Sequence, residues 1–398
     1  MSPTPHSSPT EGRLLALLSA LLYGLFTLLP NSSGLMVSWP FVFIWQVALL
    51  TPILWSLWQV GQRRRLQGLG QGLDVLMLLV VGVLLLNGLT AQFVAPARWY
   101  AWASLGFVAT LYALNGWLTQ GNQSEREERR RALLNFQGYL SGAFIAVSLL
   151  WWTWQTLIPH LQLLAQFKSL GVNQSFSFNN LELRNWAPLG HQNYVAGYLV
   201  LALPLLALFT FLGRGKARWW WATVLALGLL DLYTTSSRGG LLALGSMGIF
   251  ALLYLTLNRQ IPKRGLGVAV LGLLALLLSL VLTNDRLKSS LLSLGQGQGL
   301  NELSYRLLNT TIGWEMGKAH PFTGIGLGNV PLLYQKYRPF WAGRESEFAY
   351  QLHSTPAQLW AELGLGGVVL GLGFLIWLLL YIYRWRKNST PPLTSRTP

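Results

Sequence analysis

The segment at 234–240 contains residue types that suit the binding of an anion. Its sequence is TTSSRGG, with Arg238 preceded by Ser237 and followed by two glycines. Arginine supplies charged donors, serine hydroxyls add neutral donors, and glycines let a ligand approach the backbone. Arg238 is therefore a candidate anion-binding residue. Alternatively, it extends to the lipid headgroups, or it pairs with Asp231 in the preceding apolar run.

A second arginine, Arg306, lies in a segment whose apolar residues have helical spacing. Leucine or isoleucine recurs at positions 303, 307, 308 and 312, and Pro321 can end the helix. On such a helix Arg306 shares one face with positions 309 or 310, 313 and 317. These positions hold only Asn, Thr and Gly, so the face has room for a ligand beside the guanidinium. An ion pair with Glu302, four residues away, is the alternative.

His353 directly precedes a predicted helix start. The segment STPAQ at 354–358 predicts a capping box, with Thr355 as N-cap, Pro356 as first helical residue and Gln358 at the third position. The positive end of the helix dipole disfavours an imidazolium, so we expect a neutral His353 that can accept a proton. An incidental histidine at the membrane interface is the alternative. Glu362 is expected within the same span, where it would either form a hydrogen bond inside the bundle or balance the charge of the arginines.

Other chemistries lack the residues that they require. The chain has no cysteine, three aspartates without an Asp-x-Asp pair, and five histidines without metal spacing. There is no Gly-x-Ser-x-Gly elbow in a suitable context. The run GIGLGN at 324–329 follows no predicted strand, so turns or close packing explain its glycines better than a dinucleotide site. We therefore expect chemistry without a metal or another cofactor.

The chain that positions these residues has the composition of a membrane protein. Of its 398 residues, 52% are hydrophobic and 11% are charged, whereas soluble domains usually have about 25% charged residues. Several apolar runs reach the roughly 20 residues with which a helix crosses a bilayer. The sequence predicts an all-α, polytopic transmembrane bundle of about ten spans. These are 14–30, 39–60, 73–94, 99–118, 132–157, 192–213, 219–236, 239–257, 265–283 and 357–383.

The net charge of +16 is concentrated in alternate connections, which favours a membrane rather than nucleic acid as partner. By the positive-inside rule, both termini are cytoplasmic and the two longest connections face outward. The predicted organisation is a five-span N-terminal bundle (1–157), a first outer loop (158–191), central spans (192–283), a large and partly helical outer loop (284–355), a last span (356–387) and a disordered cytoplasmic tail (388–398).

Several short motifs occur in the order found in one family of membrane proteins. They are NYVA at 193–196, SSRGG at 236–240, Arg306 in a helix before Trp314, HPFTGIG at 320–326, and His353 followed by ELGLGG at 362–367. This series, over about 185–370, resembles the O-antigen ligase and O-antigen polymerase family of the bacterial inner membrane. The family often has Asn after the histidine, where this chain has Ser354, which leaves the subfamily open.

The resemblance implies a metal-independent glycosyltransferase with a periplasmic active site. Such an enzyme moves a glycan from an undecaprenyl-pyrophosphate carrier to a hydroxyl of a glycan, lipid or protein acceptor, as a ligase, a polymerase or a protein O-glycosylating enzyme. By the same resemblance, Arg238 and Arg306 correspond to the arginines that engage the pyrophosphate. His353 corresponds to the histidine that activates the acceptor hydroxyl.

Further residues are candidates for substrate binding. They are Ser237, Asn193, Tyr194, Trp314, Arg338 and Arg344. The last two lie in an aromatic-rich part of the large loop that suits sugars or phosphorylated lipid, with packing on lipid headgroups as the alternative. Some relatives carry a bicarbonate-transport label, so a transporter of a small anion is the alternative function. A transporter would bind its substrate near the bilayer midplane, whereas these cationic residues are predicted at the outer ends of spans.

Overall fold

The computed structural model describes residues 9–176, 181, 183–257, 300–343 and 349–389, together with 267, 271, 272 and 275. Over these residues the regular secondary structure is entirely helical, which confirms the predicted all-α class for this part of the chain. The predicted span at 265–283, apart from four isolated positions, and the tail from residue 390 lie outside the described residues.

Helices occupy every predicted span that the described residues cover. They are α1 (Pro9–Leu28), the short α2 (Ser32–Leu35), α3 (Phe41–Arg63), α4 (Leu73–Thr90), α5 (Val94–Leu118), α6 (Gln123–Trp152), α8 (Gln192–Leu212), α9 (Gly215–Thr235), α10 (Arg238–Leu257) and α16 (Leu365–Ser389). The large loop contains α13 (Leu300–Ala319), α14 (Val330–Leu333) and a 3-10 turn (Phe340–Ala342), and it leads into α15 (Thr355–Leu363). The prediction that this loop is partly helical is therefore confirmed.

Six helical segments within the described residues are long and apolar enough to cross a membrane. They are Glu11–Leu28, Phe41–Arg63, Leu73–Thr90, Gln123–Ser169, Gln192–Leu212 and Leu365–Trp385. Helices α5, α9 and α10 fill predicted spans but fall outside this set. For α5 and α9 a physical reason is their polar content, since α5 includes Arg98 and Asn115 and α9 starts with Lys216 and Arg218. The segment Arg238–Leu252 of α10 is apolar but shorter than the helices of this set. The structure thus supports a multi-pass protein with about six such helices, while the full count of ten stays a prediction.

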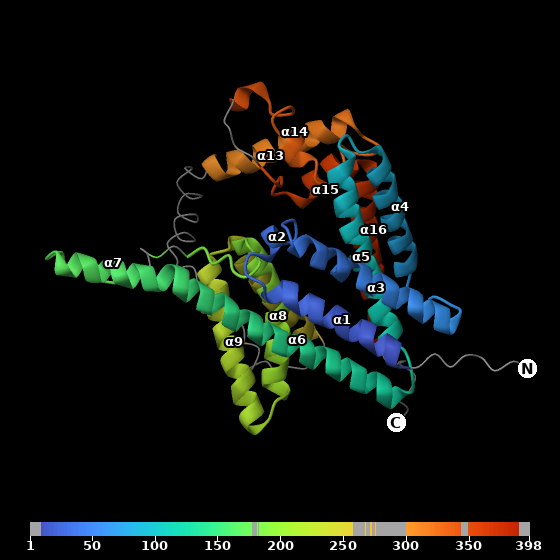
Figure 1. Cartoon of the computed structure of the whole chain (residues 1–398), viewed down its shortest axis with the longest axis horizontal. Coiled ribbons are helices and arrows are strands. Elements are labelled where there is room, and N and C mark those ends of the chain that lie inside the picture. The colour runs from blue at the N-terminus through green and yellow to red at the C-terminus, as the bar shows by residue number, and fades with distance from the viewer. Residues whose placement is uncertain are drawn as a thin grey trace, which may run out of the picture. The chain divides into compact units, whose positions relative to one another are not determined.

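The fifth predicted span continues beyond its expected end. A π-helical turn at Thr153–Leu157 connects α6 to α7 (Ile158–Ser169), and the two form one long rod in Figure 1. The helix thus continues past the predicted end of this span at 157, while the boundary between the N-terminal bundle and the first outer loop stays a prediction. Pro159 has no N–H for the carbonyl of Gln155, and the helix widens just before it, as proline within a helix often requires.

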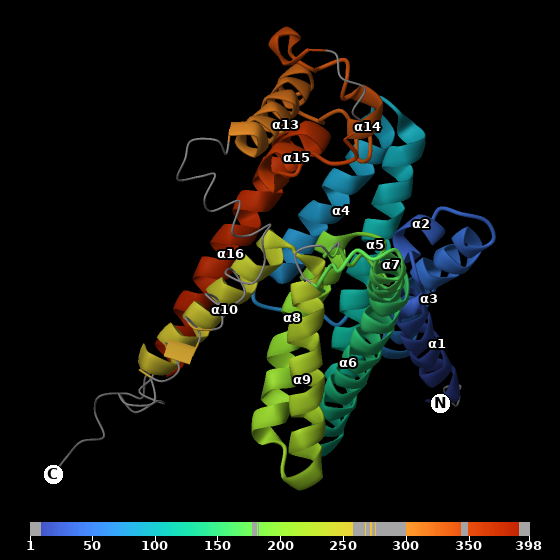
Figure 2. The same cartoon turned by 90° about the vertical axis from the view of Figure 1, so that its left-hand side faces the viewer.

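By internal contacts the chain divides into two compact units, each assembled from separate stretches of sequence. The first unit is Met1–Ala16, Leu49–Gln120 and Gly299–Pro398, and the second is Leu17–Ala48 and Gly121–Gln298. In the second unit α8 and α9 lie side by side, as Figure 2 shows. Their core includes Phe144 and Ile145 of α6, Leu199 and Leu206 of α8, and Leu232 of α9.

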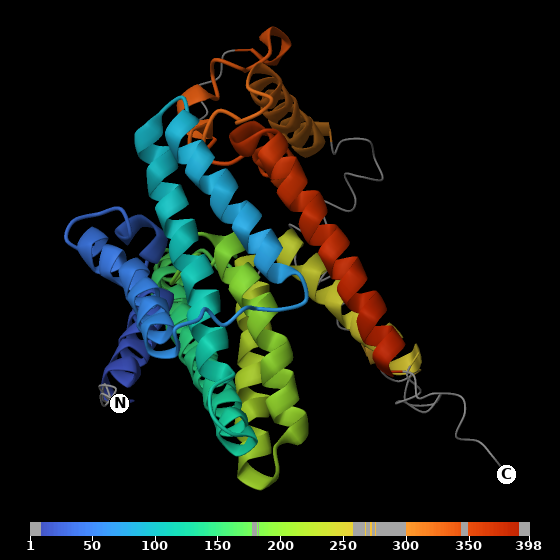
Figure 3. The same cartoon turned by 90° about the vertical axis from the view of Figure 1, so that its right-hand side faces the viewer.

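In the first unit the helices α4 and α5 lie side by side, and α16 runs along α4 (Figure 3). Helices α13 and α15 pack against each other, with α14 beside them (Figure 2). A separate core fills this region and includes Ile312 and Met316 of α13, Leu352 and Ala361. Helices α13, α14 and α15 therefore pack together around a core of their own, in addition to α16.

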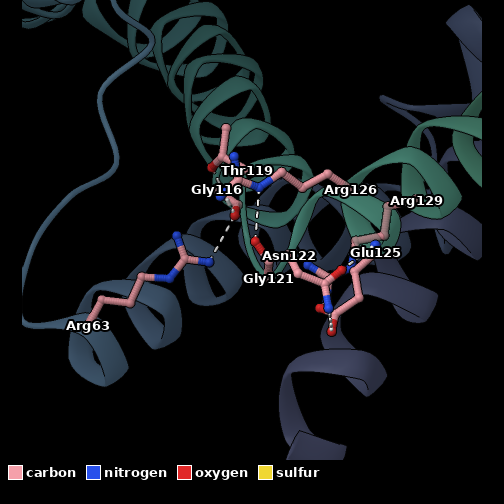
Figure 4. A network of polar contacts seen from close by, with 8 residues as sticks. All are labelled: Arg63, Gly116, Thr119, Gly121, Asn122, Glu125, Arg126 and Arg129. Carbon is pink, nitrogen blue, oxygen red and sulfur yellow. Dashed lines mark hydrogen bonds and ion pairs between the residues drawn. The ribbon is translucent and has the colours of Figure 1, made fainter.

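Hydrogen bonds and a helix cap fix the helix ends next to the basic runs (Figure 4). In the first unit, Arg63 at the end of α3 donates to the carbonyl of Gly116 in α5 at 2.8 Å. In the second unit, the Asn122 side chain caps α6 by accepting from the backbone N–H of Glu125 at 2.9 Å. Arg126 donates to the carbonyl of Gly121 at 2.9 Å. These contacts anchor arginines of the two runs at 63–65 and 126–131.

Candidate functional site

Small residues let α13 and α15 approach each other closely. A Cβ atom at Gly313 would lie 2.7 Å from the Leu352 side chain, and one at Gly317 would overlap the Trp360 indole. The buried Asn309 side chain accepts a hydrogen bond from the Tyr334 hydroxyl at 2.7 Å. The small polar face that we expected to leave room beside Arg306 is thus largely filled by packing. Arg306 itself is exposed near the start of α13, and the side chain of Glu302 lies outside the described residues.

His353 lies two residues before α15, next to the aromatic ring of Tyr305. The two ring centroids are 6.0 Å apart, so His353 contacts the residue that precedes Arg306 in α13. The backbone of His353 is in the left-handed region, with a φ of 51°. The side chain is exposed.

The start of α15 differs by one residue from the predicted capping box. Ser354 is the N-cap, and its carbonyl accepts from the N–H of Gln358 at 2.8 Å, so Thr355 is the first helical residue. The Gln358 side chain accepts from the N–H of Leu352 at 2.8 Å, rather than from the predicted cap residue. His353 nevertheless precedes a helix N-terminus, as expected.

A cavity of about 380 Å³ opens beside His353. His353, Ser354, Gln358 and Glu362 line it from α15 and the residue pair before this helix. Tyr100 of α5 and Gly328 of the glycine-rich segment also contribute to the lining. The cavity therefore brings a histidine, a carboxylate, a hydroxyl and an amide to one space.

Glu362 is a buried acid at the wall of this cavity, with 8% of its surface exposed. Its Oε1 accepts from the N–H of Gly328 at 2.9 Å. Burial raises the pKa of Glu362 to about 7, although the hydrogen bonds from Gly328 and Gln358 act in the opposite direction. This acid is thus partly protonated near neutral pH.

Glu362 lies on a short helix separate from the last apolar helix, whereas the sequence predicted one continuous span over both. The chain breaks after α15 at Gly364, whose φ is 58°, and the apolar segment that could cross a membrane begins at Leu365. The backbone N–H of Leu365 donates to the carbonyl of Pro321 at 2.7 Å, so the break is held by the preceding loop. The acid therefore ends a short helix outside the apolar segment.

The glycines at 324, 326 and 328 serve close packing, which confirms the structural interpretation of this run. All three have positive φ. A Cβ atom at Gly324 would overlap the backbone of Glu362, and one at Gly328 would overlap the Tyr100 ring. Only glycine combines this backbone conformation with such close approach.

Asn87 of α4 anchors the same segment, and it was not among the predicted site residues. Its Nδ2 donates to the carbonyls of Thr323 and Glu362 at 3.0 and 2.8 Å, and its Oδ1 accepts from the N–H of Leu327 at 2.9 Å. The residue is 2% exposed. In the sequence, the available signal was a single amide side chain within an apolar run. Such an amide is costly to bury without hydrogen-bond partners.

Two candidate residues of the second unit meet at the turn between α9 and α10. The Ser237 hydroxyl donates to Asn193 Oδ1 at 2.9 Å, and Ser236 takes a φ of 50°. Arg238 follows as the first residue of α10 and is half-buried. Asp231 Oδ1 accepts from Ser148 at 2.8 Å and from Asn185 at 2.9 Å, so this oxygen has partners other than an arginine.

The remaining candidate residues for substrate binding are not among the described residues that line the cavity. Tyr194 is exposed at the start of α8, with its ring 5.1 Å from that of His191. Trp314 packs on Trp360, with ring centroids 5.7 Å apart. Arg338 donates to the carbonyl of Ala342 at 3.1 Å, and Arg344 lies outside the described residues. No group of three or more His, Asp or Glu side chains that could hold a metal occurs in the described part of the chain.

The fold defines a multi-pass helical membrane protein with a cavity beside a histidine, and polar side chains line part of this cavity. Residues 223–372 match the family model described as O-antigen ligase, Wzy_C. This match covers less than half of the chain and includes Arg238, Arg306 and His353, whereas Asn193 and Tyr194 precede it. The chain has no significant match among curated proteins or among solved structures.

Proposed function

We propose that the protein is a glycosyltransferase that moves a glycan from a lipid pyrophosphate carrier to an acceptor hydroxyl on the periplasmic side of the membrane. The O-antigen ligase match suggests glycan transfer in a membrane. The observation that carries the finer proposal is the position of His353 at a cavity whose lining, apart from Tyr100, comes from the matched residues.

His353 serves as the general base in this proposal. Its neutral imidazole takes the proton from the acceptor hydroxyl, and the hydroxyl oxygen forms a bond to the anomeric carbon of the donor. The bond from this carbon to the pyrophosphate oxygen breaks, and the lipid pyrophosphate leaves with the electron pair. A single displacement of this kind inverts the configuration at the anomeric carbon. The exposed position of His353 at the cavity supports access for an acceptor.

In this proposal Arg306 stabilises the charge of the departing pyrophosphate, and the family resemblance implies that Arg238 also binds pyrophosphate. Guanidinium groups bind phosphate oxygens through several donors and can take the place of a metal ion. Arg306 is exposed and follows Tyr305, which contacts the His353 ring. Arg238 follows a turn that the Ser237–Asn193 hydrogen bond holds.

Transfer with purified full-length protein, a lipid-linked oligosaccharide and an acceptor glycan tests this proposal. We expect His353→Ala to reduce the transfer rate by about 10²–10⁴-fold, which is typical for loss of a positioned base. His160→Ala is the matched control, because His160 lies in α7 outside the cavity lining and should not affect transfer. Full transfer by His353→Ala would refute the role of this residue. Bicarbonate flux in proteoliposomes without any glycan transfer would contradict the function itself.

A further inference from the structure

The cavity beside His353 has the lining expected of a site for an uncharged sugar. Its polar groups include the hydroxyl of Ser354, the amide of Gln358 and the carboxyl of Glu362, which can all bond to sugar hydroxyls. The aromatic rings of Tyr100 and Tyr350 also border it. Such rings provide apolar faces for the C–H surface of a sugar ring.

The size of the cavity fits a small ligand. About 380 Å³ is near the lower end of the roughly 300–1,000 Å³ of ligand sites. This space suits a single sugar unit better than a long oligosaccharide. The remainder of an acceptor chain would then extend past the exposed rim, where Tyr350 and Gln351 lie.

The charge of the lining disfavours an anion. Among the described residues, no lysine or arginine lines the cavity, whereas Glu362 contributes a carboxyl group. A buried carboxylate repels a second negative charge more strongly than an exposed one, because the surroundings screen it less. The pyrophosphate of the donor therefore has no cationic partner here, whereas an uncharged acceptor meets no repulsion.

We propose that this cavity binds the neutral sugar unit that carries the attacking hydroxyl, and that Glu362 disfavours acidic sugars at this position. The inference rests on the proposed function and specifies its acceptor class. Glu362 is well placed for this role, because Gly328 N–H holds its Oε1 at 2.9 Å and the loop that donates this bond also borders the cavity. The carboxyl group is thereby fixed in the wall.

Binding of simple glycosides without donor tests the inference separately from catalysis. Full-length protein in lipid nanodiscs is titrated at pH 8 with methyl glycosides of glucose, galactose and mannose and with the matching methyl uronides, and saturation-transfer NMR gives the affinities. At this pH Glu362 is mostly ionised, given its pKa of about 7. We expect at least one neutral glycoside to bind about tenfold more tightly than its uronide, the discrimination that about 1.4 kcal/mol provides.

Glu362→Gln should reduce this preference to less than about twofold, because the glutamine keeps an oxygen for the Gly328 N–H and removes the charge. Glu315→Gln is the control, since Glu315 is a surface residue of α13 that pairs with Lys318 and does not line the cavity. An unchanged preference in Glu362→Gln, or no binding of any neutral glycoside, would overturn the inference. Displacement of the glycoside by the lipid-linked donor would also overturn it, because the donor sugar would then occupy the cavity.

The two proposals can fail independently. If wild-type protein transfers glycan but binds neutral and acidic glycosides equally, the cavity assignment is wrong and the proposed function stands. If wild-type protein selects neutral glycosides but transfers no glycan from any lipid-linked donor, the proposed function is wrong.

Discussion

Asn87 is a single side chain that connects three backbone segments of the first unit. It bonds to the loop at Thr323 and Leu327 and to the end of α15 at Glu362. The residue pairs involved are 236 to 275 positions apart in sequence. Loss of the amide removes this partner from the Thr323 carbonyl and the Leu327 N–H, whereas the Glu362 carbonyl keeps a bond from the Gly326 N–H at 3.1 Å.

We expect Asn87→Leu to destabilise the protein strongly, because each buried group left without a partner costs about 1–3 kcal/mol. Thermal unfolding in detergent should show a clear fall in Tm. Asn115→Leu is the control, since Asn115 makes one exposed hydrogen bond, to the Gly68 carbonyl at 2.9 Å. An equal fall in both variants would show that Asn87 has no special structural role.

Glu362 makes stability depend on pH. Burial raises its pKa from 4.5 to about 7 in the folded protein, so the folded state binds the proton more tightly than the unfolded state. Its stabilising contribution is complete below pH 4.5 and is lost as pH rises through 7. The Tm of wild type relative to Glu362→Gln should therefore fall between pH 5 and pH 8. Every other titratable group is present in both proteins, so a constant difference in Tm would contradict the effect of Glu362.

At the scale of elements, the break between α15 and α16 decides which residues border the cavity. A continuous helix from Thr355 would place Glu362 inside the last apolar segment. Gly364 ends α15 with a φ of 58°, and a Cβ atom there would lie 2.5 Å from the carbonyl oxygen of Pro321. The break is therefore a feature that the glycine makes possible.

Gly364→Ala should reduce stability by about 1–3 kcal/mol, the usual range for a residue forced into such a backbone conformation. Gly371→Ala in α16 is the matched control, because its Cβ atom would make only an ordinary contact of 3.8 Å with Leu359. There the substitution should be neutral or stabilise by up to roughly 1 kcal/mol. Thermal unfolding in detergent measures both, and equal Tm values would argue against strain at Gly364.

At the scale of the whole molecule, the proposed function requires that the cavity lies on the outer side of the membrane. The charge distribution along the sequence predicts this orientation through the positive-inside rule. The absence of cysteine from the chain makes the orientation simple to test, because any introduced cysteine is the single labelling site.

A membrane-impermeant maleimide should label Phe340→Cys in intact bacterial cells, because Phe340 is 97% exposed in the loop predicted to face the periplasm. Arg131→Cys, in the basic run predicted to be cytoplasmic, should react only after the membrane is permeabilised. The wild-type chain provides the background. The opposite labelling pattern would place the cavity in the cytoplasm and refute the proposed topology.

The sequence by itself determined the class of the protein and most of its helices. Apolar runs of the length of a bilayer crossing and alternating basic connections are local properties, so they can be read along the chain. The O-antigen ligase resemblance was also readable from short ordered motifs, and the match over 223–372 confirms it. Local patterns also predicted Arg238 at the start of a span, Arg306 on a helix and His353 before a helix start, whereas the roles of these residues stay proposals.

The tertiary structure alone decided what surrounds these residues. Gly313 and Gly317 looked like space for a ligand, but α15 fills most of that face. Asn87, Tyr100 and Glu362 come together with a loop more than 200 residues beyond the first two, and no local pattern could indicate this. Helical periodicity specifies which residues share a face, but it carries no information about which distant segment packs there. The cavity is made by such packing, and it therefore became visible only in the folded chain.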